Sequence, residues 1–147
     1  MYYSHQDFQQ DIIKLTSDII TAGQEFDYIV GIVRGGAIPA VCLSHSLGIP
    51  MRVVSWSTFH KEQMREHALD IAEDISDGKR ILLVDDILDS GRTMQELLDD
   101  WGCKQDNIKL AVLLHNTDQP IVPNFYGRRF SREKNPDWID FWWEQLA

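Results

Sequence analysis

Short apolar runs alternate with amphipathic stretches along this chain, and this order predicts the fold class. Four apolar runs are too short for most helices and suit strands buried on both faces. Apolar positions that return every three or four residues predict helices that end near Thr21 and Leu47 and another that begins near Met94. Strands that alternate with helices indicate the α/β class, with a central, mostly parallel sheet flanked by helices. The four strands are predicted at 28–33, 51–56, 81–84 and 108–114.

The segments between and after these elements differ in polarity. Residues 125–130 are predicted as a short edge strand, and an aromatic segment follows at 138–143. Residues 57–70 are polar and have no clean period, so we expect a long loop there. Ligands of parallel sheets bind beyond the carboxyl ends of the strands, so the loops that follow strands are expected to converge on one face. These loops lie at 34–36, 85–93 and 115–119.

The composition limits which kinds of molecule this protein is expected to bind. A formal net charge of -9 over 147 residues argues against a nucleic acid or an acidic membrane surface as partner. The two cysteines, Cys42 and Cys103, provide no disulfide framework. There is no apolar leader and no apolar run near 18 residues, so we expect a cytoplasmic protein that does not enter a membrane.

The strand predicted at 81–84 ends in an unusual acidic turn. Asp85 and Asp86 follow it directly, Asp89 comes three residues later, and Ser-Gly-Arg-Thr leads into the next helix. Backbone amides of such a turn and the start of the helix can hold a phosphate without a lysine. Carboxylates beside an anion site suit a sugar phosphate, because they accept hydrogen bonds from ribose hydroxyls. The alternative is an ordinary turn with a capping serine and solvated acids.

The stretch 81–93 resembles the 5-phosphoribosyl-1-pyrophosphate (PRPP) motif of the type I phosphoribosyltransferases, with Ser90 in place of a threonine. The resemblance implies that Asp85 and Asp86 hold the ribose hydroxyls and Mg²⁺, and that Asp89 is the general acid or base. It also implies one phosphoribosyltransferase domain over 1–147, with a small C-terminal hood from about 115–147. The 5-phosphate would be bound by Ser90, Gly91, Arg92, Thr93 and Met94.

The loop after the first strand resembles the pyrophosphate loop of the same family. It consists of Arg34, Gly35 and Gly36, and the glycines allow the backbone to approach an anion closely. The family often has a cis peptide here, which we place at Arg34–Gly35. The alternative is a strand-to-helix turn that carries a surface arginine.

A mobile lid is the expected role of the polar segment at 57–70. Purine-type members often have a Ser-Tyr pair there, and the hydroxyl and aromatic groups survive in this chain. The two basic residues could reach pyrophosphate when the loop closes, although a solvated charged loop is the alternative. The lid residues are Ser57, Thr58, Phe59, Lys61 and Arg65.

The C-terminal aromatic segment resembles the hood of xanthine–guanine phosphoribosyltransferases, in which a Trp-Ile pair meets the base. Here the pair is Trp138 and Ile139, and an aromatic face is a suitable partner for a flat heterocycle. The alternative is an aromatic core or a subunit interface. Members that use 6-oxopurines usually carry a lysine after the strand at 108–114, but this chain has His115 and Asn116, which we expect to contact the base.

The resemblance implies Mg²⁺-dependent transfer of phosphoribosyl from PRPP to a purine base, with hypoxanthine, guanine or xanthine favoured, in purine salvage. The partners would be PRPP and the base, in a homo-oligomer such as a dimer or tetramer. Two alternatives remain open. One is a module of the same fold that senses PRPP or a nucleotide without turnover, and the other is a phosphoribosyltransferase for adenine or a pyrimidine.

Overall fold

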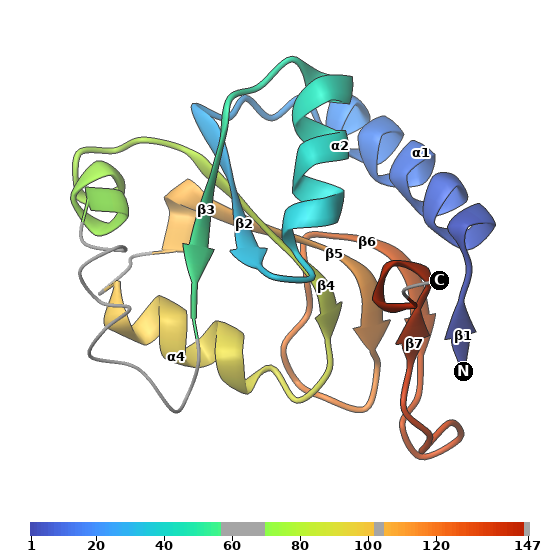
Figure 1. The fold of residues 1–147 in the computed structure, drawn as a ribbon. Coiled ribbons are helices and arrows are strands. Elements are labelled where there is room, and N and C mark those ends of the chain that lie inside the picture. Colours follow the sequence, from blue (N-terminus) through green and yellow to red (C-terminus); the bar gives the residue numbers. More distant parts are fainter. Residues whose placement is uncertain (57–69, 102–104, 146–147) are drawn as a thin grey trace.

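A computed structural model describes residues 1–56, 70–101 and 105–145 (Figure 1). Its core is a five-stranded sheet in the order β3-β2-β4-β5-β6, and all neighbouring strands are parallel. The fold class predicted from the sequence is therefore confirmed. The five strands are β2 (Tyr28–Val33), β3 (Met51–Ser55), β4 (Ile81–Leu88), β5 (Ile108–Asn116) and β6 (Phe125–Phe130).

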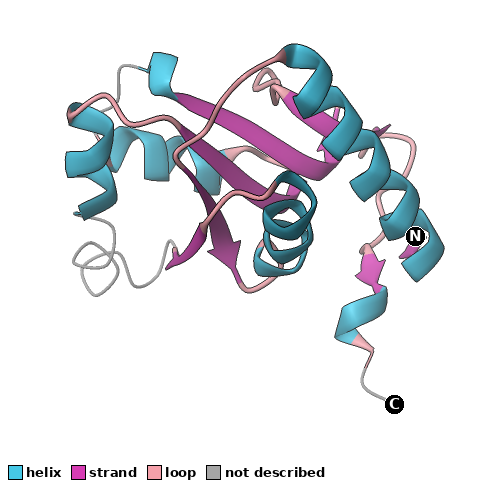
Figure 2. Cartoon of the chain, turned by 90° about the horizontal axis from the view of Figure 1, so that it is seen from above, coloured by secondary structure: helices cyan, strands magenta, loops and turns pink. Residues whose placement is uncertain are grey.

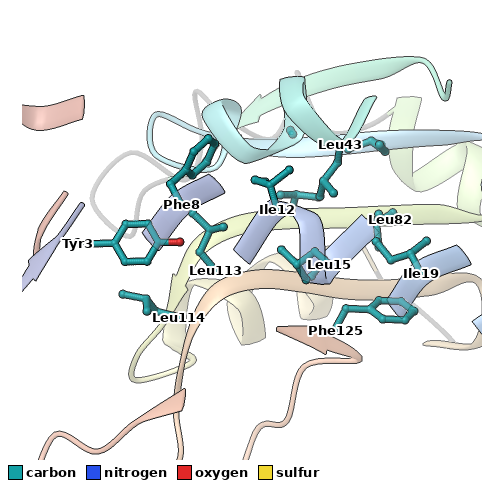
Figure 3. Packing of buried hydrophobic residues seen from close by; sticks show 14 of the residues in the cluster. Tyr3, Phe8, Ile12, Leu15, Ile19, Leu43, Leu82, Leu113, Leu114 and Phe125 are labelled. Atoms are coloured by element: carbon teal, nitrogen blue, oxygen red, sulfur yellow. The ribbon is translucent and has the colours of Figure 1, made fainter. Parts of the chain in front are cut away.

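Helices cover both faces of this sheet, and each face has its own apolar core. Helices α1 (His5–Ala22) and α2 (Ala37–Leu47) pack on one face, where α1 contributes every third or fourth residue (Figure 3). Helix α4 (Arg92–Asp100) packs on the other face with Met94 and Leu97. The α1 side chains that enter the first core are Phe8, Ile12, Leu15 and Ile19.

Local sequence signals set the ends of the first two helices. The Ser4 hydroxyl accepts from the Asp7 amide, and the Asp7 carboxylate accepts from the Ser4 amide, which completes a capping box at α1. Gly23 and Gly48 end α1 and α2 in the left-handed conformation, each with φ of 66°. The predicted ends near Thr21 and Leu47 agree with the structure to within one residue.

Several short elements were not predicted from the sequence. The chain is helical at 70–76, which extends into the segment that we expected to be a loop. The first residues form β1 (Tyr2–Tyr3), which pairs in parallel with β7 (Asp140–Phe141) in a separate two-stranded sheet. Figure 2 shows β7 close to the N-terminus, apart from the main sheet. Two short 3₁₀ helices, η1 (Gln105–Asn107) and η2 (Trp142–Glu144), complete the elements.

The predicted ends of β4 and β5 were too early. Residues 85–88 and 115–116 continue the two strands, because the ladder between them extends as far as Leu88 and His115. Polar side chains were taken as strand ends, but they extend the parallel pairing instead. Within the part of the chain that the structure describes, no helix is long and apolar enough to cross a membrane.

A buried ionic cluster ties the N-terminal strand to α1 and β6. The Asp11 carboxylate is 4% exposed and receives two hydrogen bonds from Arg128, at 2.8 and 3.1 Å. The Tyr3 hydroxyl donates to the same carboxylate at 2.7 Å, and Arg128 also contacts Asp7 at 2.9 Å. Burial, more than the neighbouring carboxylate, raises the pKa of Tyr3 far above its ordinary value.

We expect Asp11→Ala to lower the free energy of unfolding by about 2 kcal/mol or more, because Arg128 and the Tyr3 hydroxyl lose their buried acceptor. Asp18→Ala is the control, since Asp18 forms an exposed pair with Lys14 on the same helix and should cost less than about 0.5 kcal/mol. Equilibrium unfolding in urea measures both. Equal losses in the two variants would contradict the role given to Asp11.

Candidate active site

The end of β4 holds two adjacent carboxylates, Asp85 and Asp86, both half-buried. Side chains alternate between the two faces along β4, but Val84 and Ile87 pack in the same core, so the alternation slips by one residue at the acidic pair. The Asp86 amide donates to Asp85 Oδ1 at 2.9 Å. The slip allows two neighbouring acids to remain close at one edge of the sheet.

The electrostatics of this pair favour a cationic or hydroxyl-rich ligand. Burial, together with the charge of Asp86, raises the pKa of Asp85 well above its ordinary value. Burial also raises the pKa of Asp86, and the Glu144 carboxylate contributes to the rise. A ligand that brings positive charge or hydrogen-bond donors would therefore relieve the repulsion between the two groups.

The turn that follows β4 leads directly into α4. Gly91 has φ of 76°, a left-handed conformation that favours glycine, and Arg92 is the first helical residue. The Ser90 hydroxyl accepts from the Arg92 amide at 3.3 Å, whereas the Arg92 side chain turns outward to Glu96. Met94 is buried in the second core, so only its backbone faces the turn. Anion binding in this loop would therefore rest on backbone amides and the helix N-terminus.

The loop of Arg34, Gly35 and Gly36 lies against the acidic pair. A Cβ atom on Gly35 would stand 1.9 Å from Asp86 Oδ2, and one on Gly36 would stand 2.6 Å from the Val84 carbonyl oxygen. The glycines are therefore required by close approach to β4. The cis peptide joins Val33 to Arg34, one bond earlier than the Arg34–Gly35 position expected from the sequence.

Two cavities meet at this loop. The first has a volume of about 320 Å³ and is lined by Arg34, the acidic pair and the turn as far as Met94. The second has a volume of about 670 Å³ and extends to Trp138, Trp143 and Glu144 in the C-terminal segment. Arg34, Gly35 and Asp86 line both cavities. Since the exposed Arg34 side chain has no ion-pair partner among the described residues, it is available to an anion.

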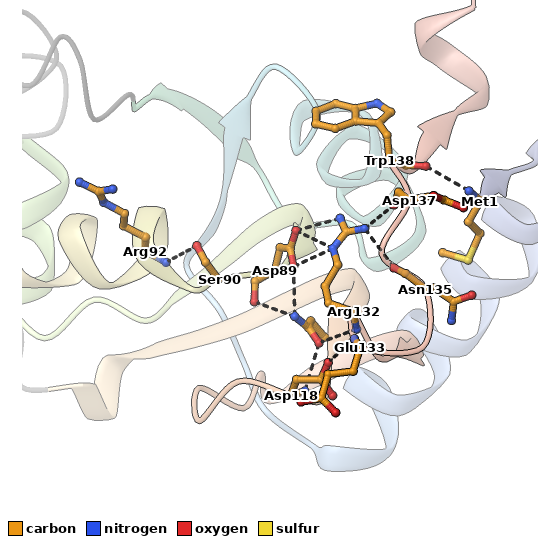
Figure 4. Close-up of polar contacts among 11 residues, drawn as sticks. Met1, Asp89, Ser90, Arg92, Asp118, Arg132, Glu133, Asn135, Asp137 and Trp138 are labelled. Atoms are coloured by element: carbon orange, nitrogen blue, oxygen red, sulfur yellow. Dashed lines mark hydrogen bonds and ion pairs between the residues drawn. The ribbon is translucent and has the colours of Figure 1, made fainter.

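A polar network joins the turn to the C-terminal segment (Figure 4). Arg132 binds the Asp89 carboxylate through Nε, at 3.0 and 3.1 Å, and through Nη2, at 2.8 Å. Asn116 Nδ2 donates to Asp89 Oδ1 at 3.1 Å, and its Oδ1 accepts from the amides of Asp118 and Arg132. Asp89 is therefore held from β5 and from the segment after β6 together.

Comparison with known proteins decides the family. A family model described as phosphoribosyl transferase domain matches residues 1–145. The chain belongs to this phosphoribosyltransferase family. The bifunctional protein PyrR of Nostoc punctiforme is 28% identical over 149 residues, which cover 89% of this chain and 83% of that protein.

Two other relatives of this chain are named for purine substrates. The xanthine-guanine phosphoribosyltransferase of Cereibacter sphaeroides is 35% identical over 71 residues, 46% of this chain and 42% of that protein. The crystal structure of a purine phosphoribosyltransferase from Pyrococcus horikoshii has a TM-score of 0.77 and 31% identity, over 100% of this chain and 95% of that chain. The family resemblance read from the sequence is therefore confirmed.

The residues of this chain that were expected to contact a base differ in how far they are exposed to solvent. Trp138 is 75% exposed and lines the second cavity, whereas the Ile139 side chain is 3% exposed and belongs to the first core. His115 is 5% exposed, lies against the Tyr126 ring, and its pKa is lowered by burial. Asn116 is 1% exposed, with its amide committed to the Asp89 network.

Two residues of the site, Arg132 and Glu144, were not predicted from the sequence. Arg132 lies six positions before Trp138, in the segment that follows β6, and its charge was the one available signal. Glu144 stands in η2 and lines the second cavity. The expected lid residues, from Ser57 to Arg65, lie outside the described part of the chain.

Asp85→Asn should stabilise the protein at high pH. Because the raised pKa of Asp85 means that the folded state holds the proton more tightly, wild-type stability falls as the pH rises from 3.8 through the raised value. The variant lacks this loss, so its stability relative to wild type should increase as the pH rises. Thermal unfolding at pH 4.5 and 8, with Asp77→Asn as exposed control, measures it. An advantage equal at both pH values would contradict the assignment.

Proposed function

We propose that this protein transfers the phosphoribosyl group of PRPP to a 6-oxopurine base and releases pyrophosphate. The observation that carries the proposal is the junction of two cavities at Arg34, Gly35 and Asp86. One cavity offers backbone amides and carboxylates, which suit a sugar phosphate. The other offers an exposed indole, which suits a flat heterocycle. Likeness to the purine phosphoribosyltransferase of Pyrococcus horikoshii supports this choice of base.

Each loop has a part in this reaction. The 5-phosphate would lie on the amides of 90–94, at the start of α4. Asp85 and Asp86 would accept hydrogen bonds from the ribose hydroxyls, and their charge would stabilise positive charge that develops on the ribose ring. Arg34 would bind the pyrophosphate, next to the glycines that bring the backbone close. Trp138 would stack on the base and hold it in line with the breaking bond.

The acidic pair also fits Mg²⁺ in part. In the described chain, no group of three or more His, Cys, Asp or Glu side chains could hold a metal alone. Mg²⁺ often binds through one or two carboxylates with substrate phosphates as the other ligands, and Asp85 and Asp86 supply that number. When bound, the ion would neutralise charge on the leaving pyrophosphate.

Asp89 is the carboxylate that would exchange a proton with the base nitrogen. It lines the first cavity and is two-fifths exposed, so a base in the second cavity could approach it. Its carboxylate forms an ion pair with Arg132, in which Oδ2 lies 2.8 Å from Nη2. A base bound at Trp138 would therefore meet an acceptor on the side of the ribose.

A second candidate is a module that binds PRPP or a nucleotide without turnover. The Arg132 contacts favour it, since the carboxylate needed for proton transfer is already engaged. The relative of Nostoc punctiforme that is named bifunctional also leaves room for a role other than purine transfer.

Incubation with PRPP, Mg²⁺ and single bases separates these candidates. We expect pyrophosphate release with hypoxanthine, guanine or xanthine, and at least tenfold lower kcat/KM for adenine, orotate and uracil. Release with adenine or a pyrimidine as the best base would overturn the choice of base but retain the transfer. Binding of PRPP without release with any base would support the non-catalytic module.

Replacement of both Asp85 and Asp86 by Asn should lower turnover at least tenfold, or about 1.4 kcal/mol of barrier, because the pair holds ribose and metal. The matched control replaces the exposed Asp77 and Asp99 by Asn, with the same change of charge. Steady-state kinetics and circular dichroism are measured on both double variants. Turnover near the wild-type rate in the Asp85, Asp86 variant would remove the pair from the reaction.

A further inference from the structure

The described residues leave open which group donates to the 6-oxygen of a base. Asn116 uses its amide on Asp89, with contacts to Oδ1 at 3.1 Å and to the carbonyl oxygen at 3.5 Å. Its Oδ1 accepts from two backbone amides, and 1% of the residue is exposed. His115 is buried against Tyr126. Neither residue can serve a base without breaking existing contacts or leaving the core.

Arg132 is placed differently, because it has one donor to spare. A guanidinium has five N–H groups. The Nε–H and one Nη2–H serve Asp89, and the two Nη1–H groups serve the carbonyl oxygens of Asn135, at 3.5 Å, and Asp137, at 2.5 Å. One Nη2–H has no acceptor among the described residues. The side chain is 26% exposed and follows the strand β6, six positions before Trp138, which lines the second cavity.

The position of the guanidinium suits a base at Trp138. It lies between Asp89 and the backbone of Asp137, the residue before Trp138, as Figure 4 shows. The Phe130 ring supports it from the side, at 5.1 Å from the centroid. Three contacts fix its orientation, so a donor to the base would not lose much side-chain entropy on binding.

We propose that Arg132 donates to the 6-oxygen of the base and thereby selects 6-oxopurines, in the place where related enzymes use a lysine. This inference rests on the proposed function, and it names Arg132 as the residue that recognises the 6-oxygen of the base. The bond is charge-assisted, and such bonds are roughly twice as strong as neutral ones. A base without a carbonyl oxygen would leave the donor unpaired, which provides discrimination.

The test compares hypoxanthine with purine, the same ring without the 6-oxygen. We expect Arg132→Gln to lower the ratio of kcat/KM for hypoxanthine to that for purine at least tenfold. Arg132→Lys keeps the charge but has three N–H donors in place of five, so its ratio should lie between those of Arg132→Gln and wild type. Arg129→Gln removes an exposed arginine from β6 and should leave the ratio unchanged. A purely structural role for Arg132 would lower both bases equally, and that outcome would overturn the proposal.

A binding experiment separates this proposal from the proposed reaction. Quenching of tryptophan fluorescence gives the Kd of inosine 5′-monophosphate and of purine riboside 5′-monophosphate for each variant. If no base is turned over but Arg132→Gln still lowers the preference for the inosine nucleotide tenfold, the reaction is wrong and the role of Arg132 stands. An unchanged preference in Arg132→Gln overturns that role. If that variant does not fold, loss of the preference in Arg132→Met, which retains the apolar stem, decides the same question.

Discussion

Burial of two neighbouring carboxylates at the end of β4 is the constraint on which the site depends. Asp85 and Asp86 have raised pKa values because burial removes water from them, so the fold keeps a costly pair at one edge. The surrounding chain accommodates the pair rather than neutralising it. Gly35 has no side chain because Asp86 fills the space beside it, and the alternation of β4 slips so that both acids stay at the same edge. Carboxylates with raised pKa values are typical of binding and catalytic sites.

Much of this arrangement follows from local sequence. Strand β2 has the predicted bounds, and α1 and α2 end within one residue of the predicted positions, because each depends on nearby residues. The acidic turn after β4 was found from its spacing alone, since neighbouring carboxylates, a left-handed glycine and a helix start all lie within nine residues.

Features that depend on contacts between residues far apart in the chain could not be predicted from the sequence. Strands β1 and β7 are two residues each, too short for any period, and they exist because the two ends of the described chain meet. Arg132 lies 43 positions from Asp89, and nothing local in a run of charged residues marks one arginine as the partner. Asn116 was expected to contact the base because it stands where 6-oxopurine members usually carry a lysine; in the structure β5 continues through it and its side chain is buried.

The Asp89–Arg132 pair connects the two halves of the site. Asp89 belongs to the turn that would hold the phosphoribosyl group, and Arg132 fixes the backbone of Asp137 just before Trp138. The pair therefore links the turn that lines the first cavity to the backbone just before Trp138, which lines the second cavity. Arg34, Gly35 and Asp86 line both cavities, so the ion pair is a second connection between the two parts of the site. A phosphoribosyl group in the first cavity and a base in the second would thus be bound by parts of the chain that hydrogen bonds hold together.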